Sequence, residues 1–377
     1  MNEFDYRIKF WNPQKNYQKY GEEILQEIKK VAESGQYVLG PTLERFEKVF
    51  ADFIGTKYAI GVNSGTDALY ISLRALGIKK GDEVITVSNT FIATIETIVR
   101  CGATPILVDI NNIYLIDVEK IEEAITEKTK AIIPVHLSGD VADMGRIQEI
   151  AKKHNLFVIE DAAQAFGAKW DNKIVGSMGE VGCFSLYPAK IMGLWGDGGV
   201  ITTNDEKIHN ECLLLRDHYK FTQSGHYTGK MPEIVQWVGN SRLDDIQAGV
   251  GLVKIRYMNE MLQKRKEFAE LYRNGLKDLP VELPNYREGR VWQDYVLRVP
   301  THQKDLAKFL DEAGIKVRGI GITPNHLIKG LNLEHFKLPK TEQYVSEFVR
   351  LPMSSELEVS EVEYIVSKIK EFYANII

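Results

Sequence analysis

The run YAIGVNSGTDALYISLRALG, residues 58–77, encodes a short strand that leads directly into a helix. Residues 58–62 are apolar, residues 67–76 carry apolar side chains at helical spacing, and Gly77 ends that pattern. Between the two lies Asn63-Ser64-Gly65-Thr66, where small residues admit a ligand close to the backbone and a helix start offers unpaired N–H groups to an anion. A Ser or Thr that merely caps the helix gives the same pattern, so both interpretations stay open at this point.

The same alternation of strand and helix extends over the first two-thirds of the chain. Further strands are expected at residues 84–87, 105–108, 130–135, 156–160, 182–186 and 199–203, and helices at 93–100, 117–125 and 143–154. Short apolar strands separated by helical segments are typical of strand–helix–strand units on a parallel sheet. The sequence therefore predicts an α/β fold.

The pattern changes near Leu243. Residues 245–272 have apolar positions at helical spacing and no proline, which predicts one long helix. A strand at 295–299, a helix at 305–313 and a terminal helix at about 359–373 follow. We therefore expect a large domain of residues 1–245 and a smaller α+β domain of residues 246–377 that begins with the long linking helix.

The overall composition is ordinary and excludes several classes of protein. Of the 377 residues, 44% are hydrophobic and 26% are charged, and the net charge of −5 argues against a nucleic-acid-binding surface. No apolar run approaches the ~18 residues of a membrane-spanning helix, and residues 1–5 lack the pattern of a secretory signal, so we expect a cytoplasmic protein. The three cysteines, Cys101, Cys183 and Cys212, form no C-x-x-C pair, and no metal site is expected.

Two later segments carry chemically useful side chains. In residues 158–164, VIEDAAQ, an apolar strand leads into Asp161, whose carboxylate either holds a proton on a heterocyclic nitrogen or caps a turn. In residues 183–190, CFSLYPAK, Lys190 stands among small and apolar residues. Desolvation there lowers a lysine pKa and favours Schiff-base chemistry, unless the side chain simply lies on the surface. A lysine, an acid and a helix N-terminus together supply what pyridoxal phosphate (PLP) needs.

The order of these motifs resembles one protein family. The segments that carry the resemblance are residues 65–69 (GTDAL), 81–86 (GDEVIT), 133–137 (IPVHL), 142–144 (ADM), 159–164 (IEDAAQ), 196–199 (GDGG) and 240–244 (NSRLD). They look like the DegT/DnrJ/EryC1/StrS family of PLP-dependent sugar aminotransferases, over essentially the whole chain. The resemblance implies the aspartate aminotransferase fold (PLP-dependent transferase fold type I), with a mostly parallel seven-stranded sheet flanked by helices in the large domain.

The resemblance also implies roles for single residues. Lys190 would form the internal aldimine with PLP and Asp161 would pair with the pyridine nitrogen, and these two would be the catalytic residues. The other cofactor contacts would be Gly65, Thr66 and Ser185 at the phosphate, Phe91 stacked on the ring, and Gln164 at the ring hydroxyl. Asn240 would reach the phosphate of a neighbouring subunit, which implies a homodimer with shared active sites.

The expected substrates follow from the same resemblance. An amino donor, by similarity L-glutamate with 2-oxoglutarate as product, would convert PLP to pyridoxamine phosphate. That form would aminate the keto carbon of a nucleotide-linked keto-deoxy sugar, for amino sugar and polysaccharide biosynthesis. Tyr187, His218, Tyr219 and His326 are candidates for substrate contacts, although the aromatic and histidine residues of 217–239 equally suit packing in a subunit interface.

Two alternatives to a sugar aminotransferase stay open, namely an inosose (cyclitol) aminotransferase of the same family and a non-enzymatic regulator that binds PLP. The sequence departs from the family pattern at Ala189, Ile191 and Met192, and Ser138 stands where tyrosine is common. These departures leave the cofactor site intact. They bear on the substrate. The sequence does not identify the nucleotide, and it does not distinguish amination at C-3 of the sugar from amination at C-4.

Overall fold

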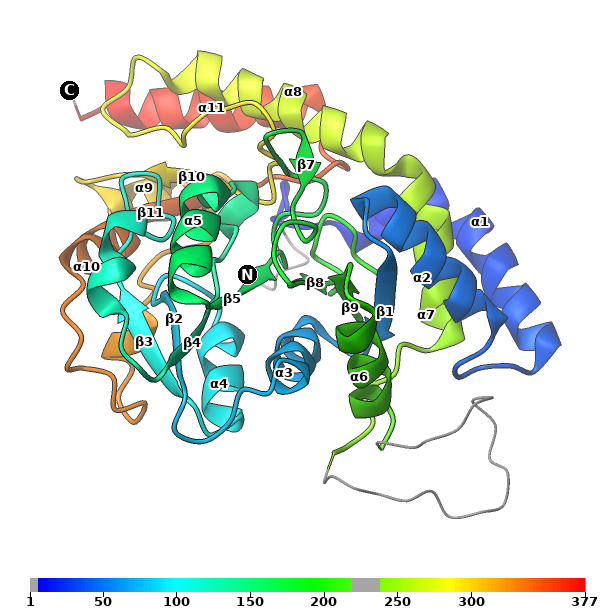
Figure 1. Ribbon diagram of the computed structural model, residues 1–377. Coiled ribbons are helices and arrows are strands. Elements are labelled where there is room, and N and C mark those ends of the chain that lie inside the picture. The colour runs from blue at the N-terminus through cyan, green and yellow to red at the C-terminus, as the bar shows by residue number, and fades with distance from the viewer. Residues whose placement is uncertain (1–5, 219–237, 377) are drawn as a thin grey trace.

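The structure, a computed structural model, describes residues 6–218 and 238–376 of the chain. Its centre is a seven-stranded sheet in the order β1-β9-β8-β5-β4-β2-β3 (Figure 1). The strands are β1 (Tyr58–Val62), β2 (Glu83–Val87), β3 (Thr104–Val108), β4 (Thr129–Ile132), β5 (Phe157–Asp161), β8 (Val181–Ser185) and β9 (Gly199–Thr203). β9 is antiparallel to both of its neighbours and the other pairings are parallel. The prediction of an α/β fold with a mostly parallel seven-stranded sheet is confirmed.

Helices cover both faces of the sheet (Figure 1). One face packs against α3 (Gly65–Ala75), α4 (Ala93–Arg100) and α6 (Glu206–Arg216), and the other against α2 (Pro41–Ile54), α5 (Met144–His154) and α7 (Asp245–Lys254). Each face of the sheet forms a hydrophobic core with its helices, and successive residues of a strand point into alternate cores. Val158 of β5 lies in the core beneath α5, and Ile159 lies in the core beneath α3. By the same alternation, Glu160 and Asp161 at the end of β5 point to opposite faces of the sheet.

A second hydrophobic core lies beside the sheet. It joins α8 (Met258–Leu276), α9 (Gln303–Glu312) and α11 (Val359–Ala374) to the antiparallel pair β10 (Tyr295–Arg298) and β11 (Phe348–Leu351). Ile8, far away in the sequence, joins this core and bridges to Ile315. Because α7 packs into the sheet core, only α8 begins the second core, and the domain boundary at residues 245/246 stays a prediction.

The segment predicted as one long helix is two helices. The 3-10 turn η4 (Ile255–Tyr257) separates α7 from α8, and α8 continues to Leu276. α7 packs against α1 (Pro13–Ser34) and α2, whereas α8 packs against α11, so the chain bends where its packing partner changes.

The helix predicted at 117–125 is also different, because it consists of the short 3-10 turns η1 (Val118–Lys120) and η2 (Glu122–Ala124). Ile125 is extended, which ends the helical conformation before β4. The remaining described elements are η3 (Leu137–Gly139), β6 (Lys169–Trp170), β7 (Lys173–Ile174), η5 (Asn325–Leu327) and α10 (Pro339–Ser346).

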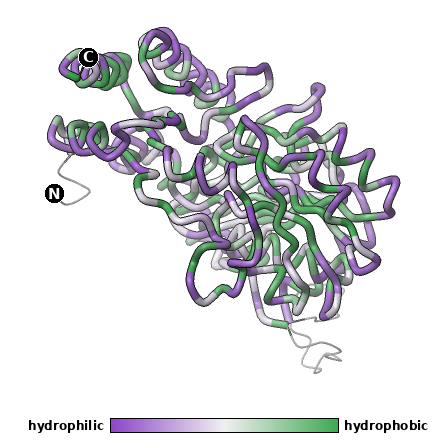
Figure 2. The backbone as a smooth tube through the Cα atoms, turned by 90° about the vertical axis from the view of Figure 1, so that its left-hand side faces the viewer, coloured by the Kyte–Doolittle hydropathy of each residue, from purple (hydrophilic) through white to green (hydrophobic). Residues whose placement is uncertain are grey.

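Hydropathy follows this layering. Figure 2 shows hydrophobic residues concentrated in the interior of the molecule, while its peripheral segments alternate between hydrophobic and hydrophilic residues. Among the helices of residues 6–218 and 238–376, none combines the length and the apolar character needed to cross a bilayer.

Candidate active site

One cavity of ≈ 530 Å³ opens at the carboxyl edge of the parallel strands. It lies beyond the ends of β1, β2, β5 and β8, where open α/β sheets bind their ligands. Eight of the residues singled out in the sequence line it, namely Gly65, Thr66, Phe91, Asp161, Gln164, Ser185, Tyr187 and Lys190. The fold therefore brings side chains from several distant loops to a single place.

The start of α3 forms one wall of this cavity. Ser64 caps the helix, since its Oγ accepts a hydrogen bond from the Asp67 N–H at 3.1 Å and its carbonyl accepts one from the Ala68 N–H at 2.9 Å. The N–H groups of Gly65 and Thr66 precede these bonds and are oriented as helix N-termini present them to anions. A Cβ on residue 65 would lie 2.7 Å from the Ser185 Cβ, so glycine is required for Ser185 to approach the helix start.

Asp161 ends β5 with a buried carboxylate. The Thr94 hydroxyl, from the first turn of α4, donates to Oδ2 at 2.8 Å, and the Ala163 N–H donates to Oδ1 at 3.2 Å. Burial raises the pKa of Asp161, although these two hydrogen bonds and the positive charge of Lys190 oppose the shift. A cation placed in the cavity against this carboxylate would therefore stabilise its ionised form.

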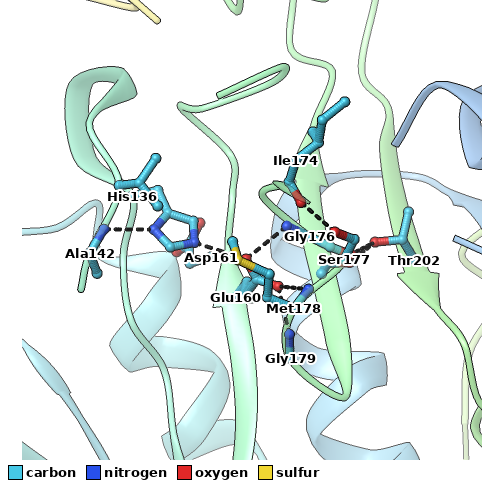
Figure 3. Close-up of polar contacts among 12 residues, drawn as sticks. His136, Ala142, Glu160, Asp161, Ile174, Gly176, Ser177, Met178, Gly179 and Thr202 are labelled. Carbon is cyan, nitrogen blue, oxygen red and sulfur yellow. Dashed lines mark hydrogen bonds and ion pairs between the residues drawn. The ribbon is translucent and has the colours of Figure 1, made fainter. Parts of the chain in front are cut away.

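Glu160, the neighbour of Asp161, points away from the cavity into a buried hydrogen-bond network (Figure 3). Its carboxylate accepts three backbone N–H groups from the segment before β8, those of Gly176 at 2.8 Å and of Met178 and Gly179 at 2.7 Å each. These three donors satisfy the hydrogen-bonding capacity of a fully buried carboxylate. It ties the end of β5 to the loop that leads into β8.

His136 completes this network (Figure 3). The Ala142 N–H donates to His136 Nδ1 at 3.2 Å, so the ring proton is on Nε2, which donates to Glu160 at 3.1 Å. The His136 N–H also donates to the Asp161 carbonyl at 3.0 Å. The segment after β4 is thereby fixed to both residues at the end of β5, which holds the Asp161 carboxylate in place.

Glu160→Gln is expected to lower the free energy of unfolding by roughly 2–4 kcal/mol, because the new amino group would face buried N–H donors that lose their acceptor. Chemical denaturation measures this loss. The control Glu149→Gln, on the exposed Arg146–Glu149 pair of α5, should change stability by less than about 0.5 kcal/mol. Equal, small effects of both substitutions would contradict this role for Glu160.

Lys190 lies in the turn that follows β8. Gln293 clamps that turn, since its Nε2 donates to the Ala189 carbonyl at 3.1 Å and its Oε1 accepts the Ile191 N–H at 3.1 Å. Burial lowers the pKa of Lys190, while the charges of Asp294 and Asp161 oppose this shift and that of Arg350 adds to it. A lysine with a lowered pKa has a larger neutral fraction, which is the nucleophilic form.

Two aromatic side chains at the cavity are unusually exposed for their size. Phe91 is 68% exposed and Tyr187 is 52% exposed, and both line the cavity. Gln164 lies nearby with its Oε1 accepting the Ser138 N–H at 2.9 Å, which leaves its amino group for the cavity. Exposed aromatic faces beside a polar amide suit a planar, polar ring as ligand.

Other predicted contacts lie elsewhere. Asn240 lines a separate cavity of ≈ 80 Å³ beside α3, and His218 is half-buried at Gly239, outside the cavities described above. His326 is fully buried, with its ring nitrogens against Ser88 Oγ at 2.8 Å and the Glu342 carboxylate at 3.2 Å. Its side chain therefore has no surface to offer a substrate and instead supports the loop after β2. Tyr219 lies outside the described residues.

Several residues of the site were not anticipated. Thr94, Gln293 and Asp294 are common residue types whose importance comes from the side chains that they meet. His136 and Glu160 do stand inside the IPVHL and IEDAAQ motifs, so the motifs contained a signal for them. Within residues 6–218 and 238–376, no group of His, Cys, Asp or Glu is arranged to hold a metal ion.

A buried acid, a desolvated lysine and a helix N-terminus surround one cavity of this α/β fold, and this combination suits a phosphorylated ring cofactor. The chain belongs to the DegT/DnrJ/EryC1/StrS aminotransferase family, whose model matches residues 18–370.

Named relatives agree with this membership. The chain is 41% identical to a dTDP-3-amino-3,6-dideoxy-alpha-D-galactopyranose transaminase from Aneurinibacillus thermoaerophilus, over 94% of this chain and 96% of that protein. It is 39% identical to a protein from Geobacillus stearothermophilus named pleiotropic regulatory protein, over 95% and 96% of the two chains. A crystal structure of NtdA from Bacillus subtilis with bound cofactor PMP superposes with a TM-score of 0.88, at 32% identity, over 94% of this chain and 82% of that one.

Proposed function

We propose that this protein is a PLP-dependent aminotransferase that moves an amino group to the keto carbon of a nucleotide-linked keto-deoxy sugar. L-glutamate would be the donor and 2-oxoglutarate the second product. The observation that carries this proposal is that Lys190, Asp161 and the N-terminus of α3 line one cavity. Membership of an aminotransferase family and the sugar transaminase among the relatives support it.

The residues present fit PLP. The Asp161 carboxylate is buried and calls for a cationic partner, which a protonated ring nitrogen would supply. Ser185 lies against the N-terminus of α3 at the wall of the cavity, where hydroxyl and N–H groups suit a phosphate, and the exposed Phe91 side chain suits a ring face. Gln164 has an amino group left for the ring hydroxyl.

Each group then has a defined task. Asp161 would keep a proton on the ring nitrogen, and Thr94 with the His136–Glu160 pair holds that carboxylate in place. Gly65, Thr66 and Ser185, which line the cavity, would hold the phosphate, and Phe91 would hold the ring. Bound PLP supplies an aldehyde that combines with amines and a ring that accepts electrons. Lys190 Nζ takes a proton from the α-carbon of the amino donor and returns a proton as the amino group is passed on.

Asn240 is proposed to act in the site of a second copy of the chain. It does not line the main cavity of its own chain and instead lines the smaller cavity with Asp67 and Arg100. We infer a homodimer in which each subunit contributes Asn240 to the phosphate of its partner. Tyr187, at the mouth of the main cavity, is the proposed sugar contact.

The test is transfer of nitrogen. PLP-loaded protein is incubated with isotope-labelled L-glutamate and a panel of dTDP- and UDP-linked keto sugars, with an inosose in parallel, and the products are analysed by mass spectrometry. We expect the label in one nucleotide-linked sugar, with 2-oxoglutarate formed in equal amount. A regulator, as the name of the Geobacillus relative would suggest, would bind PLP and transfer no label.

A further inference from the structure

Lys254, the last residue of α7, is a buried lysine that the proposed reaction does not use. Its side chain does not line the main cavity, and its Nζ donates to the backbone carbonyl of Gly193. Burial lowers the pKa of Lys254 to about 8, with the charge of Arg265 adding to this shift and that of Glu356 opposing it. An apolar side chain would fill this space at a lower cost in free energy, so the N–H donors distinguish the lysine from a packing residue.

The acceptor of this hydrogen bond, Gly193, belongs to the turn that carries Lys190. The turn closes where the Leu194 N–H donates to the Leu186 carbonyl at 2.9 Å. A Cβ on residue 193 would lie 2.1 Å from the carbonyl oxygen of Pro188, so the backbone segments before and after Lys190 are in direct contact. A bond that holds Gly193 therefore also holds the segment that precedes Lys190.

α7 gives this turn a well-packed support. The helix packs against α1 and α2, and besides Lys254 it supplies Gln247, whose Oε1 accepts the Trp195 N–H at 3.2 Å. Gln293, by contrast, holds the residues directly beside Lys190 from the start of the second core. The turn is thus attached on one side to the second core and on the other to a helix of the sheet core.

We propose that Lys254 is a positioning residue, which holds the Gly193 carbonyl and thereby fixes the turn from which Lys190 acts in the main cavity. This inference rests on the proposed function and adds to it a residue outside the cavity. A nucleophile that also transfers protons must be held close to its productive geometry, and its supporting side chains supply that precision. If Lys254 only stabilised the fold, its loss would instead weaken every property of the site together.

The test compares Lys254→Met with Lys254→Gln. The two new side chains have equal length and end one atom short of a lysine, but only glutamine keeps an N–H donor for the Gly193 carbonyl. Cofactor-free protein is mixed with PLP, and absorbance follows the bond that Lys190 Nζ forms with the aldehyde as water is released. We expect the rate constant of this capture to fall roughly tenfold in Lys254→Met and about threefold in Lys254→Gln, because misplacing a reacting group by about 1 Å costs up to a hundredfold.

Two further measurements separate positioning from a general loss of structure. Pyridoxine phosphate carries an alcohol in place of the aldehyde, so it fills the cavity without bonding to Lys190, and its calorimetric affinity should stay within about twofold in both variants. In PLP-loaded protein, L-glutamate should convert the cofactor with a rate constant lowered about as much as that of capture, at a half-saturating concentration within about twofold.

Leu310→Ala is the control for stability, since it opens a cavity in the second core on α9, away from the turn. It should lower the denaturant concentration at the unfolding midpoint at least as far as Lys254→Met does. It should nevertheless capture PLP within about twofold of the unaltered rate.

Three outcomes would overturn this inference. The first is unaltered capture of PLP by Lys254→Met. The second is a loss of pyridoxine phosphate affinity by the same factor as the loss of capture, and the third is equally slow capture in Leu310→Ala. If Lys254→Met does not fold, the same measurements on Lys254→Gln decide in the same way. Failure of the unaltered protein to bond PLP at all would count against the proposed function, which is a different result.

Discussion

Lys190→Ala is expected to lower the turnover number by at least about ten-thousand-fold, while the folded structure and the cavity persist. The side chain is proposed both to hold the cofactor and to move the proton at the donor carbon, so one substitution removes two contributions. The loss should appear in the half-reaction with L-glutamate as well as in full turnover. Steady-state kinetics and single-turnover absorbance measure the two separately.

The control for this variant is Lys173→Ala, which removes an exposed lysine from β7 and should leave the turnover number unchanged. Small primary amines added to Lys190→Ala should restore part of the activity, because they supply the missing base. Activity within tenfold of the unaltered enzyme in Lys190→Ala would show that another group performs the proton transfer.

Asp161→Asn is expected to lower the turnover number roughly a thousand-fold, corresponding to about 4 kcal/mol of activation free energy. A neutral amide cannot keep a proton on the ring nitrogen, and the cofactor then accepts electrons poorly. The exposed Asp171→Asn is the matched control and should be without effect. Turnover that stays within tenfold of the unaltered enzyme would remove Asp161 from the proposed role.

Although Asp161→Asn is expected to lower the turnover number, it should raise the free energy of unfolding at neutral pH when no cofactor is bound. The pKa of Asp161 is raised by burial, so the folded protein without cofactor holds a proton there more tightly than the unfolded chain does. The contribution of this group to the free energy of unfolding therefore falls as pH rises from acid toward neutral. Asp161→Asn should reduce the dependence of the free energy of unfolding on pH in this range. With PLP bound, the variant should no longer be more stable than the unaltered protein. Denaturation with and without PLP, across pH, measures both effects.

Local pattern predicted the strands well. β1 and β9 begin and end at the residues expected, and all of their residues except Tyr58 are buried. The break at Ile255–Tyr257 was not predictable, because its cause lies in the packing of α7 on α1 and α2 and of α8 on α11. Helical periodicity continues through such a bend and does not reveal it.

The residues of the site likewise include some that the local sequence pattern could indicate and others that it could not. Lys190 and Asp161 were candidates because a charged residue within or beside an apolar run is conspicuous, and their expected roles came from the family resemblance. Lys254 and Thr94 were not, because a lysine or a threonine at one end of a helix has no distinguishing local pattern, and the fold brings them to the Gly193 carbonyl and the Asp161 carboxylate. His326 shows the converse, since a residue that matches a family position is fully buried and supports a loop.

The central claim is that this enzyme transfers an amino group to a nucleotide-linked keto sugar through Lys190. The most direct test runs the isotope-labelled L-glutamate experiment with the unaltered enzyme and Lys190→Ala side by side, each loaded with PLP. We predict labelled nitrogen in the nucleotide-linked sugar, with one 2-oxoglutarate formed for each transfer, and no label above background with Lys190→Ala. Absence of label from every keto sugar with the unaltered enzyme, or equal labelling by both proteins, would contradict the account.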